Sequence, residues 1–380
     1  MRVSGNVLTP AGWIKGTVEF GERIAAIGAD AGAGAGLTIL PGFIDLHVHG
    51  AGGADIMQGG DACVTIARCH ARHGTTAMLG TTLTAHEDAI RHALAAMRGS
   101  IALRPAGAAR MLGVHLEGPF LNPGRLGAQP PDTIPASLEL VRSLDAIAPI
   151  RVLTLAPEVG CHLQLIPQLS AIGKHGIRVQ IGHSAGSYED GVAALAAGAR
   201  GFTHLFNAMT ALAHRQPGMV GAALAHAQYA EIIPDLEHVS AGALRTALRA
   251  IPRLYGVTDA TAATGMPDGE YALGRQRVFK CGSCVRLASG SLAGSVLTMD
   301  QALRNLVGLG LDLAEASQRL SLFPAEYLGE SLRGRLVPGA YADLVVLDAA
   351  LRPVAVYVEG ESIDLAIPAP STLPSTLEFE

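Results

Sequence analysis

The sequence predicts an α/β protein: a (β/α)8 TIM barrel with a small β-sandwich domain that both chain ends build together. Two observations carry this prediction. Between residues 43 and 258, strand-like runs alternate with helix-like runs, and further strand-like runs lie near each end of the chain. The 380 residues are 49% hydrophobic and 16% charged, which is enough apolar material to bury a large core.

The central part of the chain supplies the barrel. Short apolar runs bounded by turn residues predict strands at 43–48, 76–81, 111–116, 151–156, 177–182, 201–205, 229–234 and 254–258. The gaps between them predict helices at 61–73, 86–98, 135–147, 162–173, 187–198 and 240–250. In such a barrel, functional residues are expected where the strands end and the following loops begin.

The two chain ends supply the smaller domain, which we place at residues 1–40 plus 335–380, leaving 41–334 for the barrel. Strand-like runs occur at both ends, at 2–8, 13–20, 23–27, 342–347 and 354–358. The glycine-rich stretch 31–36 is expected to be a flexible loop. The residues from about Ile367 are rich in Pro, Ser and Thr, and are expected to be loose.

The first predicted strand of the barrel is apolar but carries two histidines. In the stretch Pro41-Gly-Phe-Ile-Asp-Leu-His-Val-His-Gly50, His47 and His49 are two residues apart. Side chains at i and i+2 of a strand point to the same side, so both imidazoles can reach one metal ion. The alternative is a pair of surface histidines near a turn, but histidines within an apolar strand are costly unless they have a function.

Four further strand ends carry residues that bind metals or transfer protons. They are Glu117 after the third strand, His183 after the fifth, His204 after the sixth and Asp259 after the eighth. One histidine at a strand end is as often structural as functional, but four such ends beside a His-x-His pair are hard to attribute to chance. His115 shares the face of Glu117 by strand alternation and is a candidate for supporting it.

These residue types predict a metal-dependent hydrolase. Imidazole nitrogens and carboxylate oxygens suit a borderline divalent ion such as Zn²⁺ or Fe²⁺. Such an ion lowers the pKa of a bound water and polarises the carbonyl group that the water attacks. Asp259, at the last strand end, is placed to take the proton of that water and pass it to the leaving nitrogen.

Five short motifs point to one family. They are His115-Leu-Glu-Gly-Pro-Phe120, Gly182-His-Ser184, His204-Leu-Phe-Asn-Ala-Met209, His214-Arg-Gln-Pro-Gly218 and Thr258-Asp-Ala260. They resemble motifs of the N-acetylglucosamine-6-phosphate deacetylases of the amidohydrolase superfamily, and the resemblance covers nearly the whole chain. It implies hydrolysis of N-acetylglucosamine 6-phosphate to glucosamine 6-phosphate and acetate, in amino-sugar catabolism.

The resemblance also implies a role for each residue at the strand ends. The ligands of the principal metal ion are Glu117, His183 and His204. Asp259 corresponds to the catalytic base and acid. Some family members replace the His-x-His pair and use a single ion. Because this chain keeps His47 and His49, it is expected to bind one or two ions, with Zn²⁺ preferred, and Glu117 would bridge a pair of ions.

Substrate contacts are implied in the same way. Asn207 and Ala208 correspond to contacts from the loop after the sixth strand. Arg215 and His238 correspond to phosphate ligands that reach in from a neighbouring subunit, which implies a homodimer whose active sites are completed across the interface. A guanidinium fork suits a phosphate chemically as well, because it donates two parallel hydrogen bonds.

Two stretches depart from the family pattern. Relatives usually carry Gly-x-His where this chain reads Gly127-Ala128-Gln129, so Gln129, with Ala128 beside it, takes the place of a histidine that helps to polarise the acetyl carbonyl. Glutamine can donate a hydrogen bond but cannot carry a positive charge. Relatives also usually read Asp-Gly-x-His where this chain has Leu236 and Glu237 before His238, and a carboxylate pointing inward there would repel a phosphate.

Composition excludes several other classes of protein. The net charge of −5 argues against a nucleic-acid binder. The first residues do not show the charged start and apolar run typical of a signal peptide, and no apolar run reaches the length expected of a membrane span. Five cysteines without a secreted-scaffold pattern favour a cytoplasmic protein. Cys281 and Cys284 form a lone Cys-x-x-Cys motif, for which a structural zinc or redox role has little support without a second pair.

Other functions stay open at this stage. The departures allow the same chemistry on N-acetylgalactosamine 6-phosphate or on an unphosphorylated N-acetyl sugar. A non-catalytic sugar-phosphate-binding relative is a further alternative, against which the intact metal and acid–base residues speak. Hydrolysis of cyclic amides is disfavoured because no lysine lies at a barrel strand end where it could be carbamylated.

Overall fold

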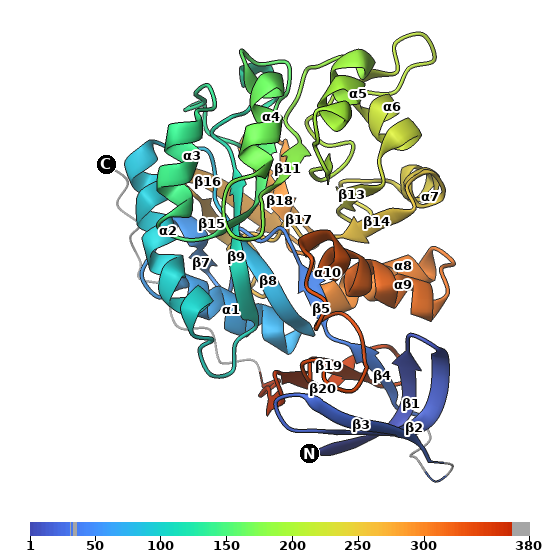
Figure 1. The fold of residues 1–380 in the computed structure, drawn as a ribbon. Coiled ribbons are helices and arrows are strands. Elements are labelled where there is room, and N and C mark those ends of the chain that lie inside the picture. Colours follow the sequence, from blue (N-terminus) through green and yellow to red (C-terminus); the bar gives the residue numbers. More distant parts are fainter. Residues whose placement is uncertain (31, 33–35, 367–380) are drawn as a thin grey trace.

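Eight parallel strands form a barrel in the computed structural model, which describes residues 1–30, 32 and 36–366, and the predicted fold class is confirmed (Figure 1). The strands are β5 (Phe43–Asp45), β8 (Thr75–Thr81), β9 (Arg110–Glu117), β10 (Ile150–Leu155), β11 (Arg178–Ile181), β12 (Gly201–Phe202), β13 (Tyr229–Ile232) and β14 (Arg253–Gly256). The expectations for residues from 367 onward, and for most of the stretch 31–36, lie outside the described residues.

Backbone hydrogen bonds close the barrel. Strands β5, β8, β9, β10, β11 and β12 pair side by side in chain order, and β13 pairs with β14. The N–H of Leu205, after β12, donates to the carbonyl of Glu231 in β13 at 2.9 Å. The N–H of Asp259, after β14, donates to the carbonyl of His47, after β5, at 2.9 Å. The last strand is therefore fixed beside the first.

Helices in the connections surround the barrel. They are α1 (Ala62–Arg72), α2 (Glu87–Ala102), α3 (Leu138–Asp145), α4 (His162–Ser170), α5 (Tyr188–Ala196), α6 (Gly218–His226) and α7 (Ala241–Ala250). Of these, only α6 was not predicted. Its residues from Gly218 to Ala223 are all buried, so it lacks the polar face that gives a helix its periodic sequence pattern. Short strands β6 (Gly50–Ala51) and β7 (Ala54–Asp55) precede α1.

The chain adds two layers after the last barrel strand, where the sequence analysis assigned no elements. The first is an antiparallel sheet of β15 (Gly269–Leu273), β16 (Gln276–Cys281), β17 (Cys284–Leu287) and β18 (Leu292–Ser295). The second is a set of three helices, α8 (Met299–Gly308), α9 (Leu313–Leu320) and α10 (Leu322–Leu328). The two cysteines of the Cys-x-x-Cys motif are cross-strand partners in the hairpin β16–β17, and both are free thiols.

Both chain ends contribute to one seven-stranded sheet in the order β21-β20-β19-β4-β1-β2-β3. Its strands are β1 (Arg2–Thr9), β2 (Gly12–Phe20), β3 (Ile24–Ala29), β4 (Thr38–Pro41), β19 (Leu344–Leu347), β20 (Pro353–Val358) and β21 (Glu361–Ser362). The sheet curls over itself, because the rings of Phe20 in β2 and Tyr357 in β20 are 5.0 Å apart although three strands separate β2 from β20. The exact domain boundaries stay a prediction.

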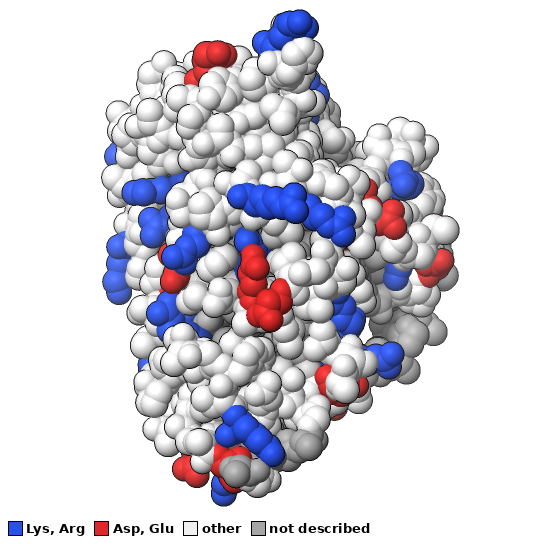
Figure 2. Space-filling view, turned by 90° about the vertical axis from the view of Figure 1, so that its right-hand side faces the viewer, with Lys and Arg blue, Asp and Glu red and all other residues white. Residues whose placement is uncertain are grey.

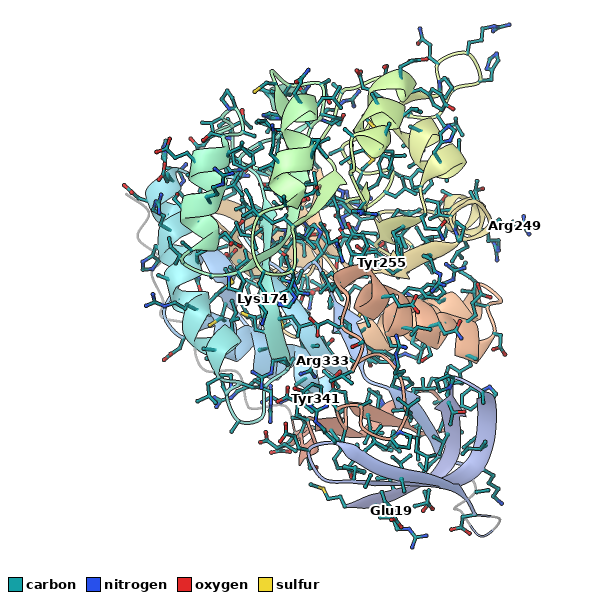
Figure 3. All side chains as sticks on the ribbon, in the orientation of Figure 1. Glu19, Lys174, Arg249, Tyr255, Arg333 and Tyr341 are labelled. Atoms are coloured by element: carbon teal, nitrogen blue, oxygen red, sulfur yellow. The ribbon has the colours of Figure 1, made fainter. Side chains whose placement is uncertain are left out.

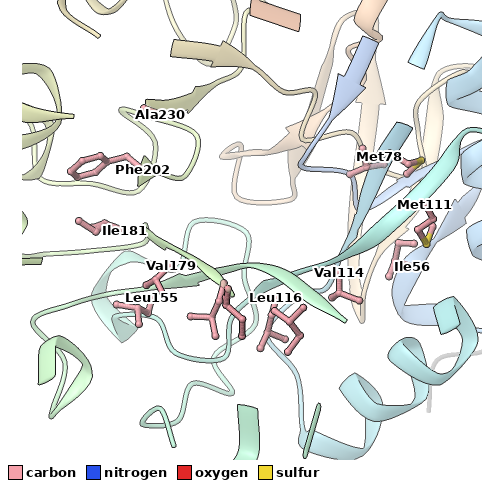
Figure 4. Close-up of a cluster of buried hydrophobic side chains, with 14 of the residues drawn as sticks. Ile56, Met78, Met111, Val114, Leu116, Leu155, Val179, Ile181, Phe202 and Ala230 are labelled. Carbon is pink, nitrogen blue, oxygen red and sulfur yellow. The ribbon is translucent and has the colours of Figure 1, made fainter. Parts of the chain in front are cut away.

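Apolar side chains fill the space between the barrel strands and the helices (Figure 4). Met78, Met111, Leu116, Val179 and Phe202 come from strands β8, β9, β11 and β12 and are each at most 1% exposed. Because strands of a parallel barrel are covered on both faces, their sequences are nearly continuous apolar runs, which explains why the strand positions were predictable.

A buried ionic cluster lies between the barrel and the seven-stranded sheet. Arg333 donates to the carboxylates of Asp343 and Glu359, and its guanidinium lies 4.1 Å from the centre of the Tyr341 ring (Figure 3). Glu359 also accepts from Arg110 of β9 at 2.6 Å. Arg333 and Asp343 are 4% and 3% exposed, so this arginine neutralises charge that water cannot reach.

The outer surface carries a mixed and sparse charge. On the face shown in Figure 2, most atoms belong to uncharged residues, and basic and acidic groups are interspersed without a broad field of one sign. Among the described residues, no helix is both long and apolar enough to cross a bilayer.

We expect Arg333→Met to lower the free energy of unfolding by about 3 kcal/mol, because the substitution leaves buried Asp343 without its cation. Denaturant unfolding measures the loss. The matched control is Arg2→Met, which breaks the exposed pair between Arg2 and Asp30 and should cost no more than about 1 kcal/mol. Equal effects of the two substitutions would show that the cluster does not stabilise the junction.

Candidate metal centre and active site

Six residues predicted from the sequence meet where the barrel strands end. They are His47 and His49 after β5, Glu117 at the end of β9, His183 after β11, His204 after β12 and Asp259 after β14. All six are buried, and the most accessible is only 8% exposed. The carboxyl ends of all parallel strands open on the same face of a barrel, so residues far apart in the chain converge there.

The carboxylate of Glu117 lies at the middle of this group. Its Oε1 is 3.1 Å from Nε2 of His183 and 3.0 Å from Nε2 of His204. Its Oε2 is 3.2 Å from Nε2 of His49 and 3.4 Å from Nε2 of His47. Each oxygen of one carboxylate therefore faces its own pair of imidazoles.

Asp259 lies beside the second pair. Its Oδ1 is 3.2 Å from Nε2 of His49 and 3.5 Å from Nε2 of His47. The backbone at Asp259 is left-handed, with φ of 52°, as it is at His183 with 47° and His204 with 29°. Non-glycine residues rarely adopt this conformation, and such strain is concentrated at functional sites.

Hydrogen bonds on the far side of two rings determine which nitrogen faces the centre. Nδ1 of His49 is 3.2 Å from the carbonyl of Thr81, and Nδ1 of His183 is 2.8 Å from the carbonyl of Arg125. Carbonyl oxygens only accept, so each Nδ1 carries the proton and each Nε2 presents its lone pair to the centre. His204 differs, because its buried Nδ1 has no hydrogen-bond partner among the described residues.

The donor set fits metal ions. Nε2 of His183 and Nε2 of His204 are 3.1 Å apart, and those of His47 and His49 are 3.2 Å apart. Ligand atoms around a tetrahedral ion with bonds of about 2.0–2.1 Å lie roughly 3.3 Å apart. Three groups have ligand atoms close enough to hold an ion, and Glu117 belongs to two of them. The third group consists of His47, His115 and Glu231. Lone pairs that face each other at this distance repel unless a cation lies between them.

The charge state of Glu117 suits this role. Burial alone would raise the pKa of its carboxyl group, but the nearby His47 and the hydrogen bonds to His183 and His204 lower this pKa well below the ordinary value. The group is therefore ionised at neutral pH and available as a ligand through both oxygens.

Glu231 is a candidate functional residue that the sequence analysis missed. It is fully buried in β13, and its Oε2 is 3.0 Å from Nδ1 of His47. Its Oε1 accepts from Nε2 of Gln180 at 3.1 Å, and the same amide nitrogen donates to the hydroxyl of Tyr255 at 2.9 Å, in the middle of the barrel (Figure 3). Because the carboxylate accepts the Nδ1 proton, Nε2 of His47 keeps its lone pair. The sequence feature that could have identified Glu231 is a charged residue inside an otherwise apolar strand.

His115 shares a strand face with Glu117 but forms its hydrogen bonds with other residues. Its Nδ1 donates to the carbonyl of Leu46 at 3.1 Å, and its Nε2 accepts from the hydroxyl of Thr154 at 2.8 Å. Burial lowers its pKa to about 4, so the ring is neutral. Both nitrogens are engaged, and the ring packs edge-on against His47 at 4.5 Å between centroids. His115 therefore fixes the position of a neighbouring imidazole.

A pocket of about 160 Å³ opens onto the centre. Five of the six residues at the strand ends line it, all except His47. The predicted substrate residues that line it are Ala128, Gln129, Asn207, Ala208 and His238. Leu83, Leu273 and Leu292 add an apolar wall, two of them from the antiparallel sheet β15–β18.

Arg215 is the predicted substrate residue that does not line the pocket. It lies in the loop between β12 and α6, where residues 211–216 are all exposed. Figure 1 shows the chain before α6 projecting from the rim of the barrel. In this conformation of the loop, Arg215 is exposed and does not line the pocket of its own subunit.

Both the oxygen and the nitrogen of the Gln129 side-chain amide form hydrogen bonds within the protein. Its Oε1 accepts from the N–H of Thr84 at 2.7 Å, and its Nε2 donates to Oε2 of Glu117 at 2.7 Å. These two bonds fix the orientation of the amide, so its second N–H is left to donate to a group in the pocket.

Leu236 and Glu237 directly precede the pocket residue His238, at the positions where relatives usually have Gly-x. Leu236 adopts φ of 70° and is 44% exposed, so it occupies a left-handed position that glycine would fill without strain. Oε1 of Glu237 accepts from the hydroxyl of Ser283 at 2.8 Å, in the turn between β16 and β17. The carboxylate is thus bound to the hairpin and does not line the pocket. His238 itself is oriented by a hydrogen bond of 2.6 Å between its Nδ1 and Oδ2 of Asp235.

Comparison with known proteins agrees with this geometry. The model of the amidohydrolase family matches residues 38–369. The chain belongs to the amidohydrolase family. It is similar to the N-acetylgalactosamine-6-phosphate deacetylase of Escherichia coli O157:H7, with 40% identity over 85% of this chain and 87% of that one. It is also similar to the N-acetylglucosamine-6-phosphate deacetylase of Lysinibacillus sphaericus, with 37% identity over 89% of each.

Solved structures of this group of amidohydrolases share the fold. The N-acetyl-D-glucosamine-6-phosphate deacetylase of Mycobacterium smegmatis, as a variant in complex with N-acetyl-D-glucosamine 6-phosphate, has a TM-score of 0.89 and 32% identity over 96% of this chain and 99% of that one. The enzyme of Thermotoga maritima has a TM-score of 0.88 and 30% identity over the same shares. This amidohydrolase is therefore an enzyme that acts on an amide, and its family is generally metal-dependent.

We expect Glu231→Gln to weaken metal binding at the pair His47 and His49 by about 10- to 100-fold. An amide N–H facing Nδ1 of His47 would clash with the proton there and favour the tautomer whose Nε2 cannot ligate. Elemental analysis after dialysis against a graded chelator measures this loss. Glu139→Gln, on the exposed face of α3, is the control. Unchanged metal content and affinity in Glu231→Gln would refute the role assigned to Glu231.

Proposed function

We propose that this amidohydrolase removes the acetyl group of N-acetylglucosamine 6-phosphate, releasing acetate and glucosamine 6-phosphate. One observation carries the proposal: Glu117 faces two imidazole pairs with separate oxygens, beside the carboxylate of Asp259, at the base of a pocket. The names of the deacetylase relatives and the sugar phosphate bound in one of them support the choice of substrate.

The proposed metal ligands fall into two sets that share one residue. Glu117, His183 and His204 would hold one ion, and His47, His49 and Glu117 a second. Nitrogen and carboxylate donors favour Zn²⁺, with Fe²⁺ as the alternative. When bound, such ions polarise the amide carbonyl and lower the pKa of water toward neutrality.

Asp259 is the proposed proton carrier. Its carboxylate lines the pocket and lies within 3.5 Å of both imidazoles of the second pair, so it can contact a water molecule held there. It accepts a proton from the attacking water and gives it to the nitrogen of the departing amine. The left-handed backbone at this residue directs the side chain into the pocket from the end of β14.

Gln129 is proposed to donate its free N–H to the acetyl carbonyl oxygen. The histidine of most relatives could add a positive charge at this point, whereas an amide adds only a dipole. The fixed orientation of Gln129 lowers the cost of making that bond, because no side-chain rotation has to be frozen when substrate binds.

Arg215 and His238 are the proposed phosphate ligands, with Arg215 supplied by a second subunit. The exposed position of the Arg215 loop, outside the pocket of its own chain, supports a homodimer whose active sites are completed across the interface. The hydrogen bond from Ser283 directs the carboxylate of Glu237 toward the hairpin, so this negative charge does not line the pocket in which a phosphate would bind.

A second substrate has a specific observation in its favour, since a relative with 40% identity is named for N-acetylgalactosamine 6-phosphate. Acetate release should be compared on N-acetylglucosamine 6-phosphate, its galactosamine epimer and free N-acetylglucosamine. A higher kcat/KM for the epimer would replace the substrate proposed here. Turnover of the free sugar alone would show that the substrate does not carry a phosphate. Binding of these compounds without any release of acetate would favour a non-catalytic sugar-phosphate-binding protein.

We also propose that the enzyme works in the cytoplasm. All five cysteines are free thiols, including the cross-strand neighbours Cys281 and Cys284, which suits a reducing compartment.

Asp259→Asn should abolish acetate release while leaving metal content unchanged, because an amide cannot accept the proton of the attacking water. Glu117→Ala is the companion variant and should lose metal, since it removes a ligand from the two groups that share Glu117. Elemental analysis and an acetate assay on the same samples distinguish the two effects. Near-normal turnover by Asp259→Asn would show that another group carries the proton.

Mixing two impaired variants tests the shared active site. Arg215→Ala alone should raise KM, and Asp259→Asn alone should be inactive. In a mixed dimer, the chain with intact Asp259 receives Arg215 from its partner. Equal mixing with subunit exchange should therefore restore about a quarter of the sites. No recovery in a mixture shown to contain mixed dimers would place Arg215 outside the partner's active site.

A further inference from the structure

A second cavity, larger than the catalytic pocket, lies between the barrel helices and the seven-stranded sheet. It has a volume of about 430 Å³ and shares no lining residue with the pocket over the metal centre. Its walls come from the end of α1, the first turns of α8 and the turn between β19 and β20. Junctions between structural layers are common places for ligand sites.

Three guanidinium groups line this cavity: those of Arg72, Arg304 and Arg352. The only carboxylate on its wall is Asp300, among the residues that the structure describes. Oδ2 of Asp300 accepts from Arg304 at 3.0 Å, and its Oδ1 is 3.2 Å from Nδ1 of His73. Asp300 and Arg304 therefore neutralise each other, and the positive charges of the other two arginines remain.

Arg304 is held rigidly. In addition to Asp300, it donates to the carbonyl of Leu351 at 3.1 Å and to Oε1 of Gln301 at 2.8 Å. These bonds tie α8 to the turn that carries Arg352. The frame of the cavity is thus set by hydrogen bonds within the protein, and it does not depend on a ligand to hold it open.

Arg72 and Arg352 are the groups left to bind a ligand. Nε of Arg72 is buried and has no hydrogen-bond partner among the described residues. A buried N–H donor without an acceptor is unfavourable, and an anion in the cavity would satisfy it. Arg352 lies on the exposed rim of the cavity and adds a second fork of donors.

We propose that this cavity is a second anion site, which takes a phosphate group either free or on a small organic molecule. Guanidinium forks match the tetrahedral arrangement of phosphate oxygens, and two of them can hold one phosphate. The volume exceeds the needs of a single phosphate, and Ala350, Pro353 and Leu365 provide an apolar side for an organic body. The site is independent of the proposed catalytic function.

The test is a binding titration on the full chain with two probes, inorganic phosphate and glucosamine 6-phosphate. We expect two classes of site per chain with glucosamine 6-phosphate. Arg72→Met and Arg352→Met should each weaken one class about tenfold or more and leave kcat/KM for deacetylation unchanged. If inorganic phosphate binds to the class of site that these substitutions weaken, and binds as tightly as glucosamine 6-phosphate does, the phosphate group alone is the ligand.

The matched control is Arg68→Met. Arg68 lies one turn earlier on the same helix, and its Nε donates to the carbonyl of Ala106 outside the cavity. This variant removes the same charge and should leave both classes of site intact. Because Arg352 is exposed on a turn, its substitution tests the site even if Arg72→Met destabilises the fold. A single class of site in the wild type, or two classes that neither substitution weakens, would overturn the proposal.

Discussion

The ionised carboxylate of Glu117 is the interaction on which the rest of the site depends. A single side chain at the end of β9 faces four imidazoles from three other strand ends, two through each oxygen. Strand lengths and loops around the barrel must place those rings to within a few tenths of an ångström. The hydrogen bonds behind the rings, to Thr81, Arg125 and Glu231, serve the same requirement, because they set the tautomer that each ring presents.

Much of this arrangement was predictable from the sequence, for a physical reason. Strands of a parallel barrel are buried on both faces, so polar residues such as His183 and His204 stand out where an apolar run ends. The antiparallel sheet β15–β18 was not predicted, because its strands are half exposed and follow no alternation with helices. Glu231 was missed because it lies inside its strand and acts through another residue. The exposed position of Arg215 required coordinates, since sequence cannot tell a loop in a pocket from one that points away.

The departures from the family pattern are compensated locally. Gln129 replaces a charge with a dipole, yet two hydrogen bonds hold that dipole in one orientation. Leu236 accepts a backbone conformation suited to glycine, and the neighbouring Glu237 is bound to the hairpin β16–β17. The inserted sheet thus has two roles: it supplies apolar wall to the pocket and it withdraws a carboxylate from the pocket edge.

The strand order of the seven-stranded sheet also determines that this sheet is completed only after the barrel has been synthesised. Strand β4 lies between β1 and β19, and β19 begins at Leu344, long after β4 ends at Pro41. At about 5–20 residues per second, a ribosome needs roughly 15–60 s to make the intervening chain. Throughout that interval one edge of β4 lacks its partner and is open to strands of other nascent chains. The barrel is therefore made while its companion sheet is incomplete, and the sheet can be completed only after β19, β20 and β21 have been synthesised.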